Sequence, residues 1–254
     1  AVALAGPLLA AGAAVFVDPA RRTAAGRTWR VADFSPPWDF ATGLLAGRLG
    51  CLKAAPGLPA AFVPDALSVT WVSHRGSLVE TSLWAPSAGD GPALRRAVLL
   101  PSGSELVAGR QREAAVGPLG RYLFEPDPAV IRAGAIGTLA AALDARAAGA
   151  GIAYLFADRL VATPFATAFE VVEVLAFNER TLRAWVREHA VGVLEIKVRG
   201  LDVDPALLRR QLKPKGSAAA TLVLTPTPSG ARALVVRRVP PTPPSGPDPA
   251  GPTA

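Results

Sequence analysis

The stretch AFEVVEVLAFNERTLRAWVREH, residues 168–189, decides the fold of the C-terminal part of this chain. Valine and phenylalanine are frequent up to residue 177, which favours a β-strand. Asn178 follows, and Leu182, Trp185 and Val186 then recur at helical spacing. The asparagine is therefore expected to cap an amphipathic helix that buries these three side chains.

The residues that follow continue the alternation of strands and helices. Gly192 is placed to end the first helix. In VGVLEIKVRG, residues 191–200, apolar and charged side chains alternate, which predicts a strand with one buried face. Asp204 and Pro205 start a second helix, and a hairpin follows up to Val239. The order β-α-β-α-β-β predicts a small α+β sandwich with ferredoxin-like topology.

The N-terminal part has a different pattern. Residues 13–17 (AAVFV) are apolar without alternation, which predicts a strand buried on both faces of a parallel sheet. A second buried strand is expected at residues 49–55, LGCLKAA. Residues 67–73 and 77–84 flank the turn His-Arg-Gly and are expected to form an antiparallel hairpin at the sheet edge.

Between these parts, residues 95–109 (RRAVLLPSGSELVAG) read as another hairpin. Asp127 is expected to cap a helix with proline in its first turn. Apolar residues at positions 131, 135, 139 and 143 keep one face of that helix apolar, so a single helix is expected over this region.

Composition limits the possible functions. The chain has 254 residues and a net charge of +7, which suggests a polyanionic partner such as nucleic acid or an anionic membrane surface. A diffuse arginine excess in a GC-rich genome explains the charge equally well. Cys51 is the one cysteine, which excludes an internal disulfide and fits a reducing cytoplasm. It lies in an apolar run and is expected to be an inert thiol.

Other features concern membranes, metals and chain length. The opening residues 1–17 are apolar but contain Gly6, Pro7 and Gly12, and are expected to form a short helix and a buried strand. No other apolar run approaches the ~20 residues that span a bilayer, so no membrane contact is expected. Neither His74 nor His189 has neighbours at metal-ligand spacing, so no metal is expected. The chain contains no methionine, which raises the possibility that it is a piece of a longer one.

The segment FVDPARR, residues 16–22, places polar residues where the first predicted strand ends. Ligands of open α/β sheets bind at the carboxyl ends of strands. The Asp18 carboxylate and the carbonyl of Pro19 can orient a substrate amine or hydroxyl, and Arg21 and Arg22 can neutralise a phosphate or a carboxylate. The alternative is that Asp18 caps the next turn while both arginines are solvated.

These segments together resemble a known family. DPARR, SPP, KAAPGL, and a hairpin with WVS and ETSLW are similar to the back half of class I S-adenosylmethionine-dependent methyltransferases. More narrowly, residues 168–225 resemble the bacterial group that carries a C-terminal THUMP-like domain. The resemblance covers nearly the whole chain outside its tail. It implies an α/β fold joined to an α+β fold, in which the back half of a Rossmann-like sheet precedes a THUMP-like domain.

The resemblance also implies roles for particular residues. Asp18 and Pro19 stand at the family's motif after the fourth strand, beside the methyl donor and the target atom. Ala20 and Arg21 replace the aromatic residue that many amino-group methyltransferases have there, which puts base stacking and N-methylation in doubt. The end of the family's fifth strand is matched by Lys53, Pro56 and Gly57, which are expected to line the donor site. Lys53 is as well explained as a structural ion-pair partner.

The donor-binding elements of this family precede its fourth strand, and the sequence contains no glycine-rich loop that matches them. The expectation is therefore a C-terminal fragment that neither binds S-adenosylmethionine nor turns over alone. The expected organisation is a partial methyltransferase domain (1–92), a connecting segment (93–165), a THUMP-like domain (166–239) and a disordered tail (240–254).

THUMP-type domains accompany RNA-modifying enzymes, so the resemblance implies RNA (tRNA or rRNA) as the partner. The alternative function is a non-catalytic RNA-binding or scaffold module. A basic surface is expected to contact RNA phosphates, unless it is an ordinary solvated face. Its residues are Arg183, Arg187, Lys197, Arg199, Arg209, Arg210, Lys213 and Lys215.

Overall fold

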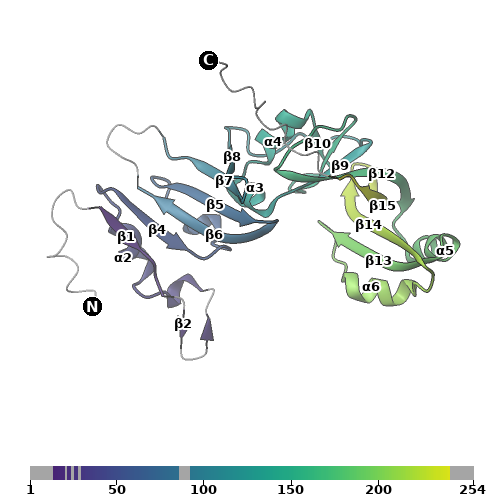
Figure 1. The fold of residues 1–254 in the computed structure, drawn as a ribbon, viewed down its shortest axis with the longest axis horizontal. Coiled ribbons are helices and arrows are strands. Elements are labelled where there is room, and N and C mark those ends of the chain that lie inside the picture. Colours follow the sequence, from purple (N-terminus) through teal and green to yellow (C-terminus); the bar gives the residue numbers. More distant parts are fainter. Residues whose placement is uncertain (1–13, 21, 24–25, 28–29, 86–91, 241–254) are drawn as a thin grey trace, which may run out of the picture.

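The computed structural model describes residues 14–20, 22–23, 26–27, 30–85 and 92–240. The strands form a six-stranded sheet, a seven-stranded sheet and a two-stranded pair. In Figure 1 the six-stranded sheet lies at the left and the seven-stranded sheet extends to the right. The tail predicted to be disordered lies outside the described residues, apart from Pro240.

The six-stranded sheet has the order β1-β4-β6-β5-β7-β8. The pairs β1/β4 and β5/β7 are parallel, and the other neighbours are antiparallel. Four strands, β1, β4, β5 and β7, therefore run in one direction, and their carboxyl ends lie along one edge. The strands are β1 (Val15–Val17), β4 (Gly50–Ala54), β5 (Ser68–His74), β6 (Ser77–Trp84), β7 (Arg95–Leu100) and β8 (Ser104–Val107).

One face of this sheet carries the first hydrophobic core. Leu52, Trp71 and Leu83 are fully buried on that face, and helix α3 packs against β5 and β7. The expectation that residues 13–17 are buried throughout is wrong, because β1 alternates and Phe16 is 71% exposed. Among the described strands β1 pairs only with β4, and the face of β1 that carries Phe16 is exposed when only the described residues are considered.

The predicted hairpin of β5 and β6 is present, with Arg75 and Gly76 at its turn. Its predicted position at the sheet edge is wrong. β6 lies between β4 and β5, and β5 pairs with β7 on its other side. β5 also pairs with the parallel strand β7, and the sequence pattern of a hairpin does not predict such non-local pairing.

The segment between the two large sheets contributes to both. Asp127 caps α3 (Pro128–Ala133) as expected, by accepting a hydrogen bond from the Ala129 amide at 2.8 Å. The single helix expected here is wrong. Gly134, at φ +69°, ends α3 in the left-handed region, and α4 (Ile136–Leu143) begins anew. The segment's remaining strands are β9 (Tyr122–Pro126), β10 (Arg146–Ala147) and β11 (Leu155–Ala157), which join the seven-stranded sheet.

The C-terminal elements occur in the predicted order β-α-β-α-β-β. Asn178 caps α5 through the Thr181 amide, and Asp204 caps α6 through two amides. The sheet order is β10-β11-β9-β12-β15-β14-β13. The predicted ferredoxin-like topology is therefore wrong, because β15 separates β12 from β14. The elements are β12 (Ala166–Ala176), α5 (Glu179–Glu188), β13 (Val191–Val198), α6 (Pro205–Leu212), β14 (Ala218–Thr227) and β15 (Gly230–Arg238).

Gly192 does not end α5, contrary to the expectation. Ala190 takes the left-handed conformation after the helix, at φ +47°. Gly192 lies inside β13, where a Cβ would overlap the carbonyl oxygen of Gly216. A Cβ on Gly216 would in turn overlap the carbonyl oxygen of Ala190. The glycine is therefore required for close approach of two backbones.

The seven-stranded sheet has two different faces. Helices α5 and α6 cover one, over a core that includes Trp185, Leu194 and Leu222. Tyr154 and Phe169 belong to a separate apolar cluster on the opposite face. Within the described residues, no helix has the length and apolarity that a membrane crossing requires.

Candidate functional site

The Asp18–Pro19 step follows the carboxyl end of β1. Val17 is in register with Leu52 of β4, so Asp18 leaves the sheet beside the end of β4. Asp18 is exposed and Pro19 is buried. Two backbone hydrogen bonds join the next residue, Ala20, to Ser35, at 2.7 and 3.1 Å. The loop is thereby held at the carboxyl edge, and the Asp18 carboxylate is open to solvent.

Of the two arginines after this step, the structure describes the backbone of one. Arg21 lies outside the described residues. The backbone of Arg22 forms β2 (Arg22–Thr23), which pairs with β3 (Gly26–Arg27). A short turn of helix, Val31–Asp33, then leads to α2 (Trp38–Gly43).

The residues predicted at the end of β4 lie on the same edge. Lys53 forms an ion pair with Glu80 of β6 at 3.0 Å. Burial opposes ionisation of Glu80, but the Ser82 hydroxyl and the Lys53 ammonium together hold the pKa of Glu80 below its usual value. Pro56 and Gly57 form the following turn, and the Pro56 carbonyl accepts a hydrogen bond from Thr81 at 3.1 Å. These contacts give Lys53 a structural role whatever else it does.

Cys51 is the second residue of β4, three positions before the strand ends at Ala54. Burial and the nearby Glu80 carboxylate raise the pKa of its thiol, against a lowering effect of Lys53. The thiol form therefore predominates at neutral pH, which fits the expected inert cysteine.

The eight predicted RNA contacts occupy three environments. Two of them link elements of the helical face. Arg183 of α5 donates to the Gln211 carbonyl of α6 and pairs with Glu179. Arg209 of α6 donates from Nε to the Leu194 carbonyl at 2.8 Å. These guanidinium groups help to hold the helices in place.

Lys197 and Arg199 lie on the opposite face of the sheet. The Lys197 ammonium contacts Glu125 of β9 at 2.9 Å and lies 5.8 Å from the ring centre of Phe169. The Arg199 guanidinium lies over the Tyr154 ring at 5.2 Å and 3.9 Å from Glu125. Burial, together with Glu125, raises the pKa of Tyr154 to about 12.

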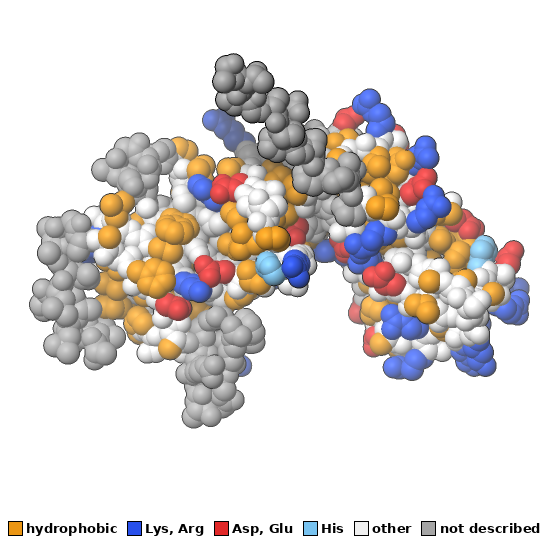
Figure 2. Space-filling view, in the orientation of Figure 1, with side chains coloured by type: hydrophobic (Ala, Val, Ile, Leu, Met, Phe, Trp, Pro, Cys, Tyr) orange, Lys and Arg blue, Asp and Glu red, His pale blue; other side chains and the backbone are white. Residues whose placement is uncertain are grey.

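The other four predicted contacts are exposed side chains on or near the helices. Figure 2 shows that Lys and Arg side chains are spread around the right-hand lobe and interspersed with acidic ones. The four are Arg187, Arg210, Lys213 and Lys215.

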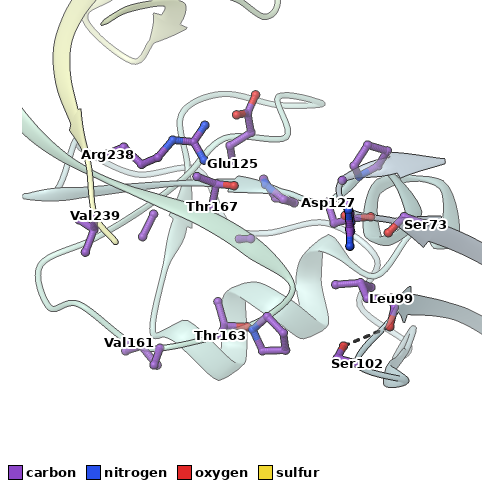
Figure 3. A pocket seen from close by; sticks show the side chains of 18 of the residues that line it. Ser73, Leu99, Ser102, Glu125, Asp127, Val161, Thr163, Thr167, Arg238 and Val239 are labelled. Carbon is purple, nitrogen blue, oxygen red and sulfur yellow. Dashed lines mark hydrogen bonds between the residues drawn. The ribbon is translucent and has the colours of Figure 1, made fainter. Parts of the chain in front are cut away.

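A cavity of about 590 Å³ lies between the two large sheets (Figure 3). The ends of β5 and β7 contribute Ser73, Leu99 and the turn residue Ser102, and α3 begins beside it at Asp127. The loop that precedes β12 forms its floor in Figure 3, at Val161 and Thr163. Its charged residues are Arg75, Glu125, Asp127, Lys197, Arg199 and Arg238.

Comparison with known proteins identifies the C-terminal part. Residues 166–238 match the family model described as THUMP domain-like. An uncharacterized S-adenosylmethionine-dependent methyltransferase from each of two strains of Mycobacterium tuberculosis is 34% identical over 230 residues. The chain contains a THUMP-like domain and is homologous to bacterial S-adenosylmethionine-dependent methyltransferases. The matched region is 89% of this chain and 64% of each relative, so the chain spans just under two thirds of their length.

A solved structure shares the fold. A crystal structure from Porphyromonas gingivalis, described as that of a candidate methyltransferase, superposes with a TM-score of 0.70. It is 21% identical in sequence, and the match covers 89% of this chain and 59% of that one. Mixed α/β sheets with few helices are therefore shared with a methyltransferase neighbour.

The carboxyl ends of β1 and β4 form one side of a ligand crevice within the described residues. An α/β ligand crevice opens between strands on both sides of a switch point. Among the described strands, β1 is at the edge of its sheet and β4 is its one neighbour. No cluster of three or more His, Cys, Asp or Glu side chains is placed to hold a metal ion within the described part of the chain.

Sequence reasoning missed three residues beside the THUMP-like domain's sheet. Arg75 was assigned only to a hairpin turn, Glu125 to no element, and Arg238 to the last strand. Arg238 lies over the Phe169 ring at 5.2 Å, on the same face as Lys197. The alternation of side chains along each strand could have placed Arg238 and Lys197 on one face of the sheet. The strand order that brings them together cannot be predicted from that alternation.

Proposed function

We propose that this chain is the C-terminal part of an S-adenosylmethionine-dependent methyltransferase that acts on RNA. One observation carries the proposal. In a chain homologous to such methyltransferases, Asp18 and Pro19 follow the carboxyl end of a parallel strand pair, β1 and β4. Fourth and fifth strands are adjacent and parallel in open α/β sheets of this kind, which supports assigning β1 and β4 to the back half of such a sheet.

In this proposal the strand-edge residues position the acceptor. The exposed Asp18 carboxylate accepts a hydrogen bond from the acceptor group, and the Pro19 carbonyl provides a second acceptor. Arg21 and Arg22 hold a neighbouring phosphate, and Lys53, Pro56 and Gly57 line the donor side. The bound donor supplies the methyl group, and these residues supply orientation. The proposed division into a partial catalytic domain, a connecting segment and a THUMP-like domain follows from the same assignment.

Three features support RNA as the substrate class. The chain carries a net charge of +7, and a THUMP-like domain is associated with RNA. Exposed cations at positions 187, 210, 213 and 215 give the helical side phosphate-binding capacity. Within the described part of the chain the exposed aromatic side chains are few, namely Phe16, Phe62 and Trp84, which favours backbone and shape recognition over base stacking.

The donor requirement gives the first prediction. We expect this chain alone to show no S-adenosylmethionine binding in isothermal titration calorimetry, because β1 leaves the crevice without its second wall. A protein that also covers the rest of the relatives' length is expected to bind the donor. Absence of binding by that longer protein would instead favour the non-catalytic RNA-binding module.

The helical side gives the second prediction. Replacing Arg210 and Lys213 with alanine is expected to weaken RNA binding and reduce its salt dependence by about one to two units of slope. Fluorescence anisotropy with a labelled transfer-RNA transcript, over a series of KCl concentrations, measures both quantities. Substituting Arg132 and Arg159 is the matched control, because it removes the same charge outside the THUMP-like domain. Equal effects of the two double substitutions would mean that only net charge matters.

A further inference from the structure

The cavity between the sheets lies at the same edge as Asp18. β1, β4, β5 and β7 all point the same way, so their carboxyl ends form one continuous edge. Ser73 and Arg75 lie at the end of β5, and Leu100 ends β7. With neighbouring strands ~4.8 Å apart, these cavity residues are roughly 15–20 Å along the edge from Asp18.

The charges of the cavity are not balanced. Four cations line it against two carboxylates, Glu125 and Asp127. Asp127 is already the acceptor of a helix-capping hydrogen bond. Glu125 is shared between Lys197 and Arg199. The cavity therefore keeps an excess of positive charge near buried apolar rings, where an anion interacts more strongly than in open water.

Arg75 and Arg238 supply the unbalanced charge. Arg238 makes a ring contact with Phe169, and the structure records no carboxylate partner for it within the described residues. Arg75 likewise has none there and extends from the β5–β6 turn. They belong to different sheets, so an extended anion between the sheets can be held from two sides.

We propose that this cavity binds the phosphodiester backbone of the RNA substrate, with Arg75 and Arg238 as the principal phosphate contacts. The inference rests on the proposed RNA function and adds to it the place where the strand is held. Arginine suits phosphate because its planar guanidinium offers parallel N–H donors to two oxygens. A strand held here can continue along the carboxyl edge toward Asp18.

The walls favour the backbone over a stacked base. Phe169 and Tyr154 are buried beneath the cations, so their rings are not available for stacking. Leu100 and Leu160 are about two-fifths exposed and offer apolar contact without hydrogen-bonding groups that would read a sequence. The volume of about 590 Å³ falls within the range of small-molecule pockets, so a nucleotide unit fits. Sequence-independent binding is expected.

The test compares three single variants of this chain with a matched control. Arg75→Gln and Arg238→Gln each remove one cavity charge, and Glu125→Gln removes the opposing carboxylate. Arg237→Gln is the control, because Arg237 directly precedes Arg238 in β15 and pairs with Glu170 on the opposite face. Binding of a labelled single-stranded RNA is measured by anisotropy over a KCl series. Hydrogen exchange with and without RNA maps the protected segments.

We expect Arg75→Gln and Arg238→Gln each to weaken binding about tenfold and to lower the salt slope by about one, and Arg237→Gln to change binding little. Glu125→Gln should strengthen binding about threefold because it releases two cations. RNA should protect residues 73–76 and 160–164 from exchange. Equal losses in all three arginine variants, without that protection, would overturn the cavity site and leave RNA binding intact. Failure of the unmodified chain to bind RNA would overturn the proposed RNA function itself.

Discussion

Replacing Gly192 with alanine is expected to lower the free energy of unfolding by about 3 kcal/mol. The added Cβ would overlap the Gly216 carbonyl, which belongs to backbone and cannot move like a flexible side chain. Relief requires β13 to separate from the segment before β14, where the Gly216 amide donates to the Val191 carbonyl at 3.0 Å. The substitution therefore acts on the parallel pair at the edge of the THUMP-like sheet.

Urea denaturation followed by circular dichroism measures this change. Ala190→Gly is the control, because it alters a residue two positions away that already has φ +47°. Glycine is unstrained in that conformation, so this variant should be as stable as the unmodified chain, or up to about 1 kcal/mol more stable. A Gly192→Ala variant with unchanged stability would show that the two backbones are not in close contact.

The two substitutions illustrate what the sequence can predict. A glycine after a helix usually marks its end, and that rule led to Gly192. The chain instead uses Ala190 in the left-handed position, because the glycine is needed for a contact with residue 216, which lies far along the sequence. The sequence correctly indicated that the helix ends near this point, but a tertiary contact determined that Ala190, and not Gly192, has the left-handed conformation.

Local signals predicted the elements well. Asn178, Asp127 and Asp204 cap helices where the sequence placed them, and the C-terminal order of strands and helices was correct. Strand order was not predicted. The insertions of β6 between β4 and β5, and of β15 between β12 and β14, depend on non-local pairing that periodicity does not encode.

The residues of the candidate site also fall into those that a local pattern predicted and those that depend on non-local pairing. The strand-end position of Asp18 followed from an apolar run that stops at a polar step. The contact of Lys197 with Glu125 joins residues 72 positions apart and could not be inferred from a pattern within one strand. The cavity depends on such pairings from both sheets, so its two principal arginines were not recognised from sequence.

Replacing Trp71 with alanine is expected to lower the free energy of unfolding by about 4 kcal/mol. Trp71 lies in the central strand β5 and is the largest fully buried side chain among the described residues. The Arg95 guanidinium lies over its ring at 5.3 Å, so the substitution also removes the support beneath a partly buried cation. The cost combines the lost apolar burial with a large void.

Thermal and urea unfolding measure the stability of Trp71→Ala and of two control variants. Trp84→Ala makes the same chemical change in the adjacent strand β6, where the side chain is 47% exposed, and should cost about 1 kcal/mol. Trp71→Phe should cost less than Trp71→Ala, because it keeps a ring and removes an indole N–H that has no acceptor among the described residues. Equal losses for Trp71→Ala and Trp84→Ala would contradict the assignment of the sheet's buried face. β5 ends at His74, between the cavity residues Ser73 and Arg75. Partial unfolding of Trp71→Ala should therefore also weaken RNA binding, and at temperatures where the variant is fully folded that loss should largely disappear.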